Sequence, residues 1–522
     1  MKKTFITTSI IFSSLLSVSF LNSCRDAIDI VQEGELTSEV VLTSVKNMEA
    51  FLNGDVYGTF DTNEQIYLSA VLSDEVKPGA SSGGQQFGLH RLFIDSKDEI
   101  NQFIWSRAYK TINRVDVLLE SAVKITPESA DVAKYNNILA QARVVRAYSY
   151  LQLQAFYSVD MKNDAGLGVM IIEGIPTTKD SFPRKSNKEV FDFINADLNF
   201  ARKILTRGAD RYRADLNVID AISARMNLYR GKHAEAKVAA LNVLNNSGIA
   251  LTQSLPATNT DNPVVGTDAW WKAFSNGNTS FNPYRNMWND SSRGEVIFSL
   301  NRLASGTGSS IGSRWNTNTS QKSGSPMWGM GRNLFNILNT TDGDIRKYAF
   351  LDPTSTIDAN YENSASPIST DQLIIDKYPG IPNAPIRNDL KLFRLSEIYF
   401  ILAECEVAEN NYSKAAEYIQ KVREARNYKG AAVTPVYTNV QVALADILKE
   451  RRVELAFEGH RLIDLKRLAV AAGVSMSRNK TDDTVEVKNL ENGSYKYTMP
   501  IPEGEMNANS SMVQNPGYGG NL

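Results

Sequence analysis

Two segments of the sequence repeat one pattern of apolar residues, and this repeat restricts the fold more than any other feature. In residues 219–241 apolar side chains recur at three- and four-residue steps on both sides of a turn at 231–233. Residues 392–422 repeat the plan around a turn at 410–411. Because this periodicity is that of amphipathic helices, each segment predicts a hairpin of two helices, which would span about 34 residues in full.

The hairpins also carry small residues where two helices would pack closely. Ala224 precedes Ala236 by the same interval that separates Ala403 from Ala415. This arrangement is typical of tetratricopeptide-like helix pairs, and a stack of such pairs needs about three units. The candidates for completing the stack are residues 134–157, 188–205 and 443–468. We therefore predict a mainly α fold built on a tetratricopeptide-like scaffold of helical hairpins.

Residues 253–390 differ from this scaffold in composition. The first part, up to about Arg332, is rich in Asn, Ser, Gly and Thr, yet it holds five of the six tryptophans. Since tryptophan is rare in disordered segments, we expect an ordered, irregular, loop-rich lobe packed on the helices. The run at 295–300 predicts a short strand within it. Two further irregular stretches are expected at 351–389 and 73–97.

The N-terminus has the layout of a secretory signal. Lys2 and Lys3 precede an apolar stretch at 5–21, and Cys24 follows a small residue. This pattern resembles a bacterial lipobox, so we expect residues 1–23 to be removed as a lipoprotein signal peptide and Cys24 to carry the lipid. Two alternatives stay open. One is a permanent transmembrane anchor, and the other is a secreted protein whose Cys24 lies near the cleavage site by chance.

Cysteine content and charge narrow the possible structures and partners. The processed chain keeps one other cysteine, Cys405, so no intramolecular disulfide is expected and Cys405 is predicted to be a buried apolar residue. Removing residues 1–23 takes away two lysines and no acidic residue, so the formal net charge falls from −2 to −4. This balance argues against a nucleic-acid partner. Beyond the N-terminus no segment is apolar enough to span a membrane, so membrane contact is expected through the lipid anchor only.

Several motifs, in a fixed order along the chain, resemble those of one protein family. They lie at 139–150, 189–201, 394–426, 450–467 and 500–518. The most specific is Glu450–Arg461, which reads E-R-R-V-E-L-A-F-E-G-H-R and is followed by Asp464. Together, and over essentially the whole chain, they resemble the SusD/RagB family of outer-membrane nutrient-binding lipoproteins. Departures at Leu462–Ile463 and Ser158–Asp160 fall at sites expected to be structural.

The resemblance implies a SusD-like fold and a function without chemistry. The protein would capture an oligo- or polysaccharide at the cell surface and deliver it to a SusC-like TonB-dependent outer-membrane transporter, which it would cover as a hinged lid. The tetratricopeptide-like face would be the surface for the transporter. The implied regions are 24–230 and 231–522, the second including the lobe at 253–390. The alternatives are a peptide-binding lid of the RagB kind and a structural subunit without a ligand of its own.

The sequence gives little support to an enzyme. His90, His233 and His460 are the only histidines, and they lack the spacing of a metal site. Gly308–Gly312 fits the G-x-S-x-G pattern, but it lacks the adjoining strand and helix that a nucleophile elbow needs. A glycosidase-like pair of carboxylates stays open, because acidic residues are numerous and no pair stands out. We therefore expect no enzyme activity, no cofactor and no metal.

Aromatic residues of the lobe are the candidates for a ligand site. A pyranose ring has an apolar face that can stack on an aromatic side chain, and its hydroxyl rim can bind amides and charged groups. In SusD-like proteins the site is similarly built from aromatic residues on loops. The candidates here are Trp270, Trp271, Tyr284, Arg285, Asn286, Trp288, Asn289, Trp315 and Trp328. For each tryptophan the alternative is a place in the lobe's own core.

A loop and a set of charged residues outside the lobe are further candidates for a binding surface. The loop at 81–90 is a second candidate rim, and its relevant side chains are Gln85, Gln86, Phe87 and His90. A set of charges at three- and four-residue spacing is expected to lie on one helix. These are Glu454, Glu458, Arg461 and Asp464. We interpret them as a structural ion-pair network rather than a binding face, and we assign Trp105 to the core.

Overall fold

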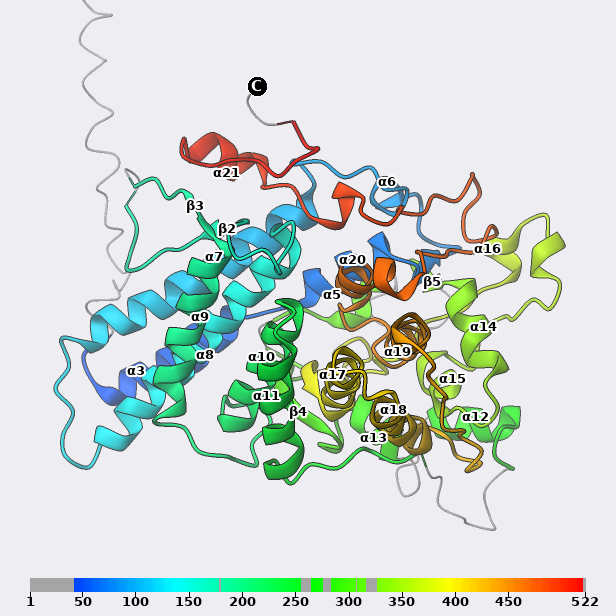
Figure 1. The fold of residues 1–522 in the computed structure, drawn as a ribbon, viewed down its shortest axis with the longest axis horizontal. Helices are drawn as coiled ribbons and strands as arrows, with labels where there is room; N and C mark the ends of the chain where they lie inside the picture. Colours follow the sequence, from blue (N-terminus) through cyan, green and yellow to red (C-terminus); the bar gives the residue numbers. More distant parts are fainter. Residues whose placement is uncertain are drawn as a thin grey trace, which may run out of the picture.

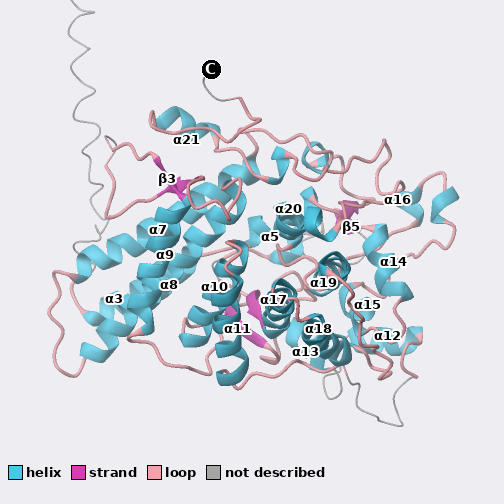
Figure 2. Ribbon diagram, viewed as in Figure 1, coloured by secondary structure: helices cyan, strands magenta, loops and turns pink. Residues whose placement is uncertain are grey.

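A computed structural model describes residues 42–177, 180–254, 264–275, 283–306, 308–315 and 326–519 of the protein. Helices dominate these segments, and the strands are few and short (Figure 2). The predicted mainly α fold, with helical hairpins and an irregular lobe that carries short strands, is confirmed. The predicted signal peptide and Cys24 lie outside the described residues.

Three helical hairpins form the scaffold in the middle of the molecule (Figure 1). They are α10 (Leu216–Tyr229) with α11 (His233–Asn246), α17 (Leu395–Ala408) with α18 (Tyr412–Arg426), and α19 (Val440–Glu454) with α20 (Arg461–Ala472). Because α11 packs on α17 and α17 packs on α19, the hairpins form one stack. The four alanines predicted at close helix contacts are fully buried, and they are Ala224, Ala236, Ala403 and Ala415.

Three long helices lie beside this stack, on the left in Figure 1. They are α7 (Glu99–Ala122), α8 (Val132–Tyr157) and α9 (Asn187–Arg202), and α8 packs against both of the others. Arg146 of α8 binds the buried carboxylates of Asp116 on α7 and Asp197 on α9. Ser186 and Glu189 form a capping box that starts α9. The predicted helices at 134–157 and 188–205 are therefore confirmed.

The remaining helices are short, and several of them build the lobe on the right in Figure 1. They are α3 (Val45–Phe51), the π-helix η1 (Leu52–Val56), α4 (Tyr57–Thr59), α5 (Asn63–Leu72), α6 (Phe87–His90), α12 (Asp268–Ser275), α13 (Pro283–Trp288), η3 (Ile311–Arg314), α14 (Arg332–Thr340), α15 (Ile345–Phe350), η4 (Tyr361–Asn363), α16 (Pro367–Thr370), η5 (Tyr495–Tyr497) and α21 (Glu503–Ala508).

Three antiparallel ladders of two strands connect segments that are far apart in the sequence. They are β1 (Val76–Pro78) with β5 (Trp328–Met330), β2 (Leu167–Met170) with β3 (Arg184–Ser186), and β4 (Val296–Leu300) with β6 (Leu390–Arg394). The predicted strand at 295–300 is confirmed as β4. Since β6 runs directly into α17, this ladder fixes the lobe to the scaffold.

The charged residues predicted to share one helix belong to a broken one. The helix α19 ends at Glu454 and α20 begins only at Arg461. Phe457 and Gly459 between them have φ values of +60° and +87°, a left-handed conformation that interrupts a right-handed helix. The prediction of one continuous helix at 443–468 is therefore wrong. The four charges bind partners on other elements instead.

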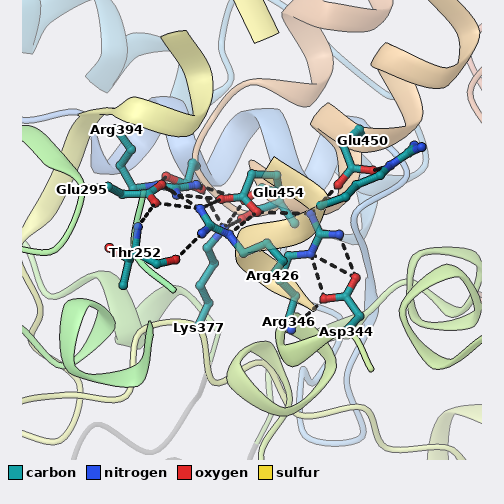
Figure 3. Close-up of polar contacts among 12 residues, drawn as sticks. Thr252, Glu295, Asp344, Arg346, Lys377, Arg394, Arg426, Glu450 and Glu454 are labelled. Carbon is teal, nitrogen blue, oxygen red and sulfur yellow. Dashed lines mark hydrogen bonds and ion pairs between the residues drawn. The ribbon is translucent and has the colours of Figure 1, made fainter. Parts of the chain in front are cut away.

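A buried ion-pair network joins the lobe to the scaffold (Figure 3). Glu454 of α19 accepts hydrogen bonds from Arg394 of β6 and Arg426 of α18, each at 2.8 Å. Both arginines also bind Glu295 in the lobe, at 2.7 and 2.8 Å. Arg346 of α15 adds a contact of 3.2 Å to Glu454. All these side chains are buried, so the interpretation of the charges as a structural network is confirmed.

Glu458 gives this network a dependence on pH. Its carboxylate binds Arg394, and it also accepts a hydrogen bond from Lys377 at 2.7 Å. Burial alone would raise the pKa of Glu458, but the two cations outweigh burial and lower the pKa from 4.5 to about 2. The ionised carboxylate therefore stabilises the fold above about pH 5, and this contribution is lost as the pH falls towards 2.

We expect the Glu458→Gln variant to lose less unfolding free energy than the native chain between about pH 6 and pH 3. The amide can still accept a hydrogen bond, but it has no charge to lose on acidification. Urea unfolding at a series of pH values measures the difference. Equal losses in the two proteins would contradict the role assigned to Glu458.

Candidate functional site

Of the nine candidate residues of the lobe, seven are buried inside it and two are partly exposed. Trp270 and Trp271 are on α12; Tyr284, Arg285, Asn286 and Trp288 are on α13; Asn289 follows α13; Trp315 follows η3; and Trp328 begins β5. The tryptophans, the tyrosine and the arginine are at most 7% exposed, and the two asparagines are half-buried. In this conformation the buried rings offer no open face for stacking. Their role as ligand contacts stays a prediction, and their burial favours the alternative of a place in the core.

Contacts within the lobe account for this burial. The Trp288 ring packs edge-to-face against Phe350 and Tyr378, with centroid distances of 6.0 and 5.8 Å. The Lys377 ammonium lies 4.5 Å from the same ring, a cation–π geometry. Arg285 donates to the carboxylate of Asp376 at 2.5 Å and is buried with it. These side chains stabilise the lobe itself.

The ladder between β1 and β5 brings the 81–90 loop to the lobe. Beyond the paired strands, the Gly79 N–H donates to the carbonyl of Met327 at 2.8 Å. A Cβ at Gly79 would lie 2.2 Å from the carbonyl oxygen of Pro326, so only glycine allows this approach. The two candidate rims, which the sequence suggested separately, are thus adjacent in the structure.

Aromatic rings fill the space between these two rims. The Trp328 centroid lies 6.3 Å from that of Phe87 and 5.4 Å from that of His90. Tyr67 of α5 packs against both Trp328 and Trp315, at 6.4 and 6.3 Å. Trp328 therefore contacts the loop directly, and Trp315 is linked to it only through Tyr67. Trp270, Trp271 and Trp288 make their ring contacts elsewhere in the lobe.

The loop from Gly79 to Phe93, here called the Gly79–Phe93 loop, contains backbone strain. Gln86, before α6, has a φ of 59°, and Leu92, after it, has a φ of 67°. The left-handed region costs a residue other than glycine on the order of 1–3 kcal/mol. Such strain persists only where the surroundings enforce it, and it is concentrated at binding and catalytic sites. The helix α6 is therefore held in a conformation that favours a functional role.

The same loop presents aromatic surface to solvent. Phe87 is half-buried, and Phe93 is 75% exposed. The amides of Gln85 and Gln86 directly precede Phe87, and the Gln85 residue is exposed. An accessible phenyl face with amide groups nearby has the chemistry that can hold a sugar ring, through stacking and through hydrogen bonds to hydroxyls.

Residues from the C-terminal part of the chain hold the loop rigid. Arg91 donates to both carboxylate oxygens of Asp483, at 2.9 and 2.7 Å. The Arg91 guanidinium lies 5.0 Å from the Phe87 ring centroid, so it fixes that ring as well. Arg478 donates to the backbone carbonyls of Ser73 and His90. A platform supported in this way does not need to be ordered when a ligand binds.

His90 does not belong to the rim, contrary to the sequence-based expectation. Its side chain is buried, with Nε2 lying 3.2 Å from the carbonyl oxygen of Val76. Burial lowers the pKa of His90 to about 4, so the ring is uncharged at neutral pH. The structure instead shows Phe93 as an exposed aromatic residue of this loop. No pattern in the sequence marks Phe93, because Leu92, Phe93 and Ile94 are all apolar, and only the structure shows that Phe93 is exposed between two buried residues.

The described segments contain neither a metal-binding cluster nor a membrane-spanning helix. Within them, no group of three or more His, Cys, Asp or Glu side chains is placed to hold a metal ion. None of their helices combines the length and the apolar composition that crossing a membrane requires. Cys405 is buried on α17, as predicted, and burial raises the pKa of its thiol.

Two family models match separate parts of the chain. The family model described as the SusD family matches residues 310–518. A second model, described as "Starch-binding associating with outer membrane", matches residues 35–226. The chain belongs to the SusD/RagB family. The two matches in this SusD-like protein include α7 to α9 on one side and α17 to α20 with the C-terminal segment on the other.

Similar proteins extend the comparison over most of this SusD-like chain. SusD-like protein P38 of Formosa agariphila is 23% identical over 512 residues, which cover 90% of this chain and 93% of the relative. A SusD superfamily protein from Bacteroides thetaiotaomicron has a TM-score of 0.71 at 19% identity and covers 91% of this chain and 100% of its own. A putative sugar binding protein from Bacteroides vulgatus has a TM-score of 0.69 at 21% identity, covering 92% and 100%. These structures share the fold.

The predicted division of this SusD-like chain at 230/231 falls in the turn between α10 and α11. These two helices pack on each other, and α11 also packs on α17 of the C-terminal region. The division into 24–230 and 231–522 stays a prediction about sequence regions.

Proposed function

We propose that the protein is a cell-surface lipoprotein that captures an oligo- or polysaccharide. It is anchored in the outer membrane by a lipid on Cys24, and it delivers the glycan to a SusC-like TonB-dependent transporter. Membership of the SusD/RagB family and the description of the N-terminal family match support this assignment. One protein with the same fold is named a putative sugar binding protein.

The observation that carries the proposal is the Gly79–Phe93 loop. It combines exposed Phe93 with half-buried Phe87, and the residues on both sides of α6, Gln86 and Leu92, have left-handed backbone conformations that the surrounding contacts enforce. The support from Arg91 and Trp328 makes the Phe87 ring a preformed platform. A preformed platform favours binding because less conformational entropy is lost.

Features of the described residues also favour binding without catalysis. His90 and His460 are buried, and burial lowers the pKa of each to about 4. Ser310, the central residue of the G-x-S-x-G pattern, lies between a bend and the short helix η3, without the strand that strains a nucleophile elbow into place. The protein therefore acts on its ligand by capture and handover.

The transporter binds the tetratricopeptide-like scaffold in this proposal. A hollow of about 240 Å³ opens on the scaffold, and apolar side chains of Leu228, Val407, Leu444 and Leu468 line part of it. Val440 and Val470 expose further apolar surface on the same helices. Because the partner keeps the bound glycan at high local concentration, the lid needs only modest affinity.

A binding experiment with the chain lacking residues 1–24 tests the proposal, since this truncation removes none of the described residues. We expect a glycan from a polysaccharide panel to bind in affinity electrophoresis and calorimetry. Phe87→Ala and Phe93→Ala should each weaken binding at least about fivefold, because each removes a stacking face. Phe103→Ala, which changes an exposed phenylalanine on α7 outside the loop, is the matched control.

Three outcomes would count against the proposal. Equal losses in all three variants would remove the Gly79–Phe93 loop from the site. Binding of a peptide mixture without any glycan would replace the ligand class by that of a peptide-binding lid of the RagB kind. Release of reducing sugar from a bound glycan, abolished by changing one carboxylate, would make the protein an enzyme.

A further inference from the structure

A polar cleft lies between the N-terminal helices and the lobe, and the Gly79–Phe93 loop takes no part in it. It consists of two adjoining hollows of about 210 and 320 Å³, which share Gly58 in their walls. The elements η1 and α4, the helix α7 and the chain after β4 all contribute lining residues. We call it the Gly58 cleft.

One wall of the Gly58 cleft has unusual local structure. The segment η1 is a π-helix that supplies Asn53 to the lining, and α4 follows it directly with Tyr57 and Gly58. Single π-helical turns within α-helical segments occur frequently at functional sites. A Cβ built on Gly58 meets no atom within 4 Å, so the space above this residue is open. A larger residue there would enter the cleft without backbone strain.

The charge of the lining is positive in a chain whose formal net charge is −2. Arg107, Lys110, Arg213 and Arg302 line the two hollows, whereas Asp61 is the one acidic residue among the lining residues. Clefts lined by charges of one sign concentrate ligands of the opposite sign. The charge of the Gly58 cleft therefore suits an anionic ligand.

The partners of these cations leave part of the charge unmatched. Arg107 has only long ion pairs, at 3.4 Å to Asp61 and 3.2 Å to Glu64, and its side chain is 35% exposed. Lys110 is exposed, and within the described part of the chain it has neither a hydrogen bond nor an ion pair. The side chains of Arg107 and Lys110 therefore have donors available to a ligand.

Asp61 is fully engaged and does not cancel this surplus. It accepts hydrogen bonds from the N–H and the hydroxyl of Ser309, and it pairs with Arg302 at 3.2 Å. Burial alone would raise the pKa of Asp61, but Arg302 and the hydrogen bonds hold it below the ordinary value. Asp61 and Glu64, which both pair with Arg107, together offset at most two of the four cations.

The hollow that Tyr57 and Tyr212 line has features that suit a sugar ring. The Tyr57 hydroxyl donates to Gln141 at 3.0 Å and accepts the Ala214 N–H at 3.1 Å, so the ring is fixed. Tyr212 is held in the same way by Asp389, at 2.8 Å. The amides of Asn53 and Asn301 lie in the same lining. Rigid aromatic side chains, amides and cations together match a saccharide that carries an acidic group.

We propose that the Gly58 cleft is a second ligand-binding site, which takes an acidic saccharide through its carboxylate or sulfate group. Arg107 and Lys110 bind the anionic group, and the tyrosine-lined hollow holds the adjoining sugar. This inference rests on the proposed function only in taking the ligand to be a saccharide, and its location is separate from the Gly79–Phe93 loop.

The test is calorimetry on the chain lacking residues 1–24 with three probes. Oligogalacturonate supplies carboxylates, a sulfated carrageenan oligosaccharide supplies sulfates, and maltohexaose is neutral. We expect one of the two acidic probes to bind, with an affinity that falls as salt is raised. Gly58→Phe, which fills the cleft, and Lys110→Gln, which removes an exposed charge, should each weaken this binding at least about tenfold.

Gly54→Phe is the matched control, because a Cβ at Gly54 also meets no atom within 4 Å and Gly54 does not line the cleft. Thermal melting checks the fold of each variant. If Gly58→Phe fails to fold, the exposed Lys110→Gln change decides. Which acidic probe binds identifies the group as carboxylate or sulfate.

Absence of binding by both acidic probes would overturn this inference, as would binding that Gly58→Phe and Lys110→Gln leave unchanged. A separate result decides the proposed function. A neutral glycan that loses affinity in Phe93→Ala but not in Gly58→Phe would support capture at the Gly79–Phe93 loop whatever the result at the Gly58 cleft.

Discussion

Replacing Arg426 by methionine should lower the free energy of unfolding by about 3–5 kcal/mol, because it leaves buried carboxylates without their partner. Arg426 donates to Glu454 at 2.8 and 3.0 Å, to Glu295 at 2.8 Å, and to the carbonyl of Thr252 at 2.6 Å (Figure 3). Both carboxylates are fully buried, so water cannot replace the lost contacts. Urea unfolding followed by circular dichroism measures the change.

The matched control lies on the same helix. Lys414 of α18 pairs with Glu417 at 2.7 Å, but both side chains are about half exposed. Exposed pairs of this kind contribute about 0–1 kcal/mol, so Lys414→Met should leave stability almost unchanged. If Arg426→Met costs no more than Lys414→Met, the network in Figure 3 does not stabilise the joint between lobe and scaffold.

The second large effect is expected at Trp288. The ring is fully buried among Phe350, Tyr378 and Lys377, and removing a buried tryptophan side chain costs about 3–5 kcal/mol. Trp288→Ala should therefore unfold at much lower urea concentration than the native chain. Phe93→Ala, which truncates an exposed aromatic residue, should change the unfolding free energy by less than about 0.5 kcal/mol.

The less stable of these two variants should keep ligand binding, and the more stable one should lose it. At a temperature where Trp288→Ala is still folded, it should bind the glycan with native affinity, whereas Phe93→Ala should not. Calorimetry on both variants measures this contrast. A Trp288→Ala protein of native stability that has lost glycan binding would restore Trp288 as a ligand contact and would contradict its place in the core.

The helical scaffold was predictable because its signal is local. The apolar stripes at 219–241 and 392–422 repeat at helical spacing, and burial of one helix face requires that spacing. The break between α19 and α20 was missed for the same reason. The charges from Glu454 to Asp464 keep helical spacing through the break, and only Gly459 interrupts an otherwise helical pattern.

The candidate site was less predictable because its determinants are not local. Composition correctly indicated packed structure in the described parts of the lobe, but it does not say which rings of such a lobe face inward. The Trp288 ring contacts Phe350, Lys377 and Tyr378, and no local sequence pattern encodes those contacts. The meeting of the Gly79–Phe93 loop with Trp328 likewise depends on the pairing of β1 with β5, which are distant in the sequence.

The C-terminal segment completes contacts of residues that lie far earlier in the chain. Arg478 binds the carbonyl of Val71, Met499 donates to the carbonyl of Phe156, and Asn515 donates to that of Tyr157. A ribosome makes the N-terminal partners of these contacts first, and the C-terminal ones come almost last. The contacts at the C-terminal end of α8 and at the base of the Gly79–Phe93 loop therefore stay incomplete until synthesis is nearly finished. In a chain whose synthesis is not finished, the strained residues Gln86 and Leu92 therefore flank a helix that still lacks the contacts from Arg478 and Asp483.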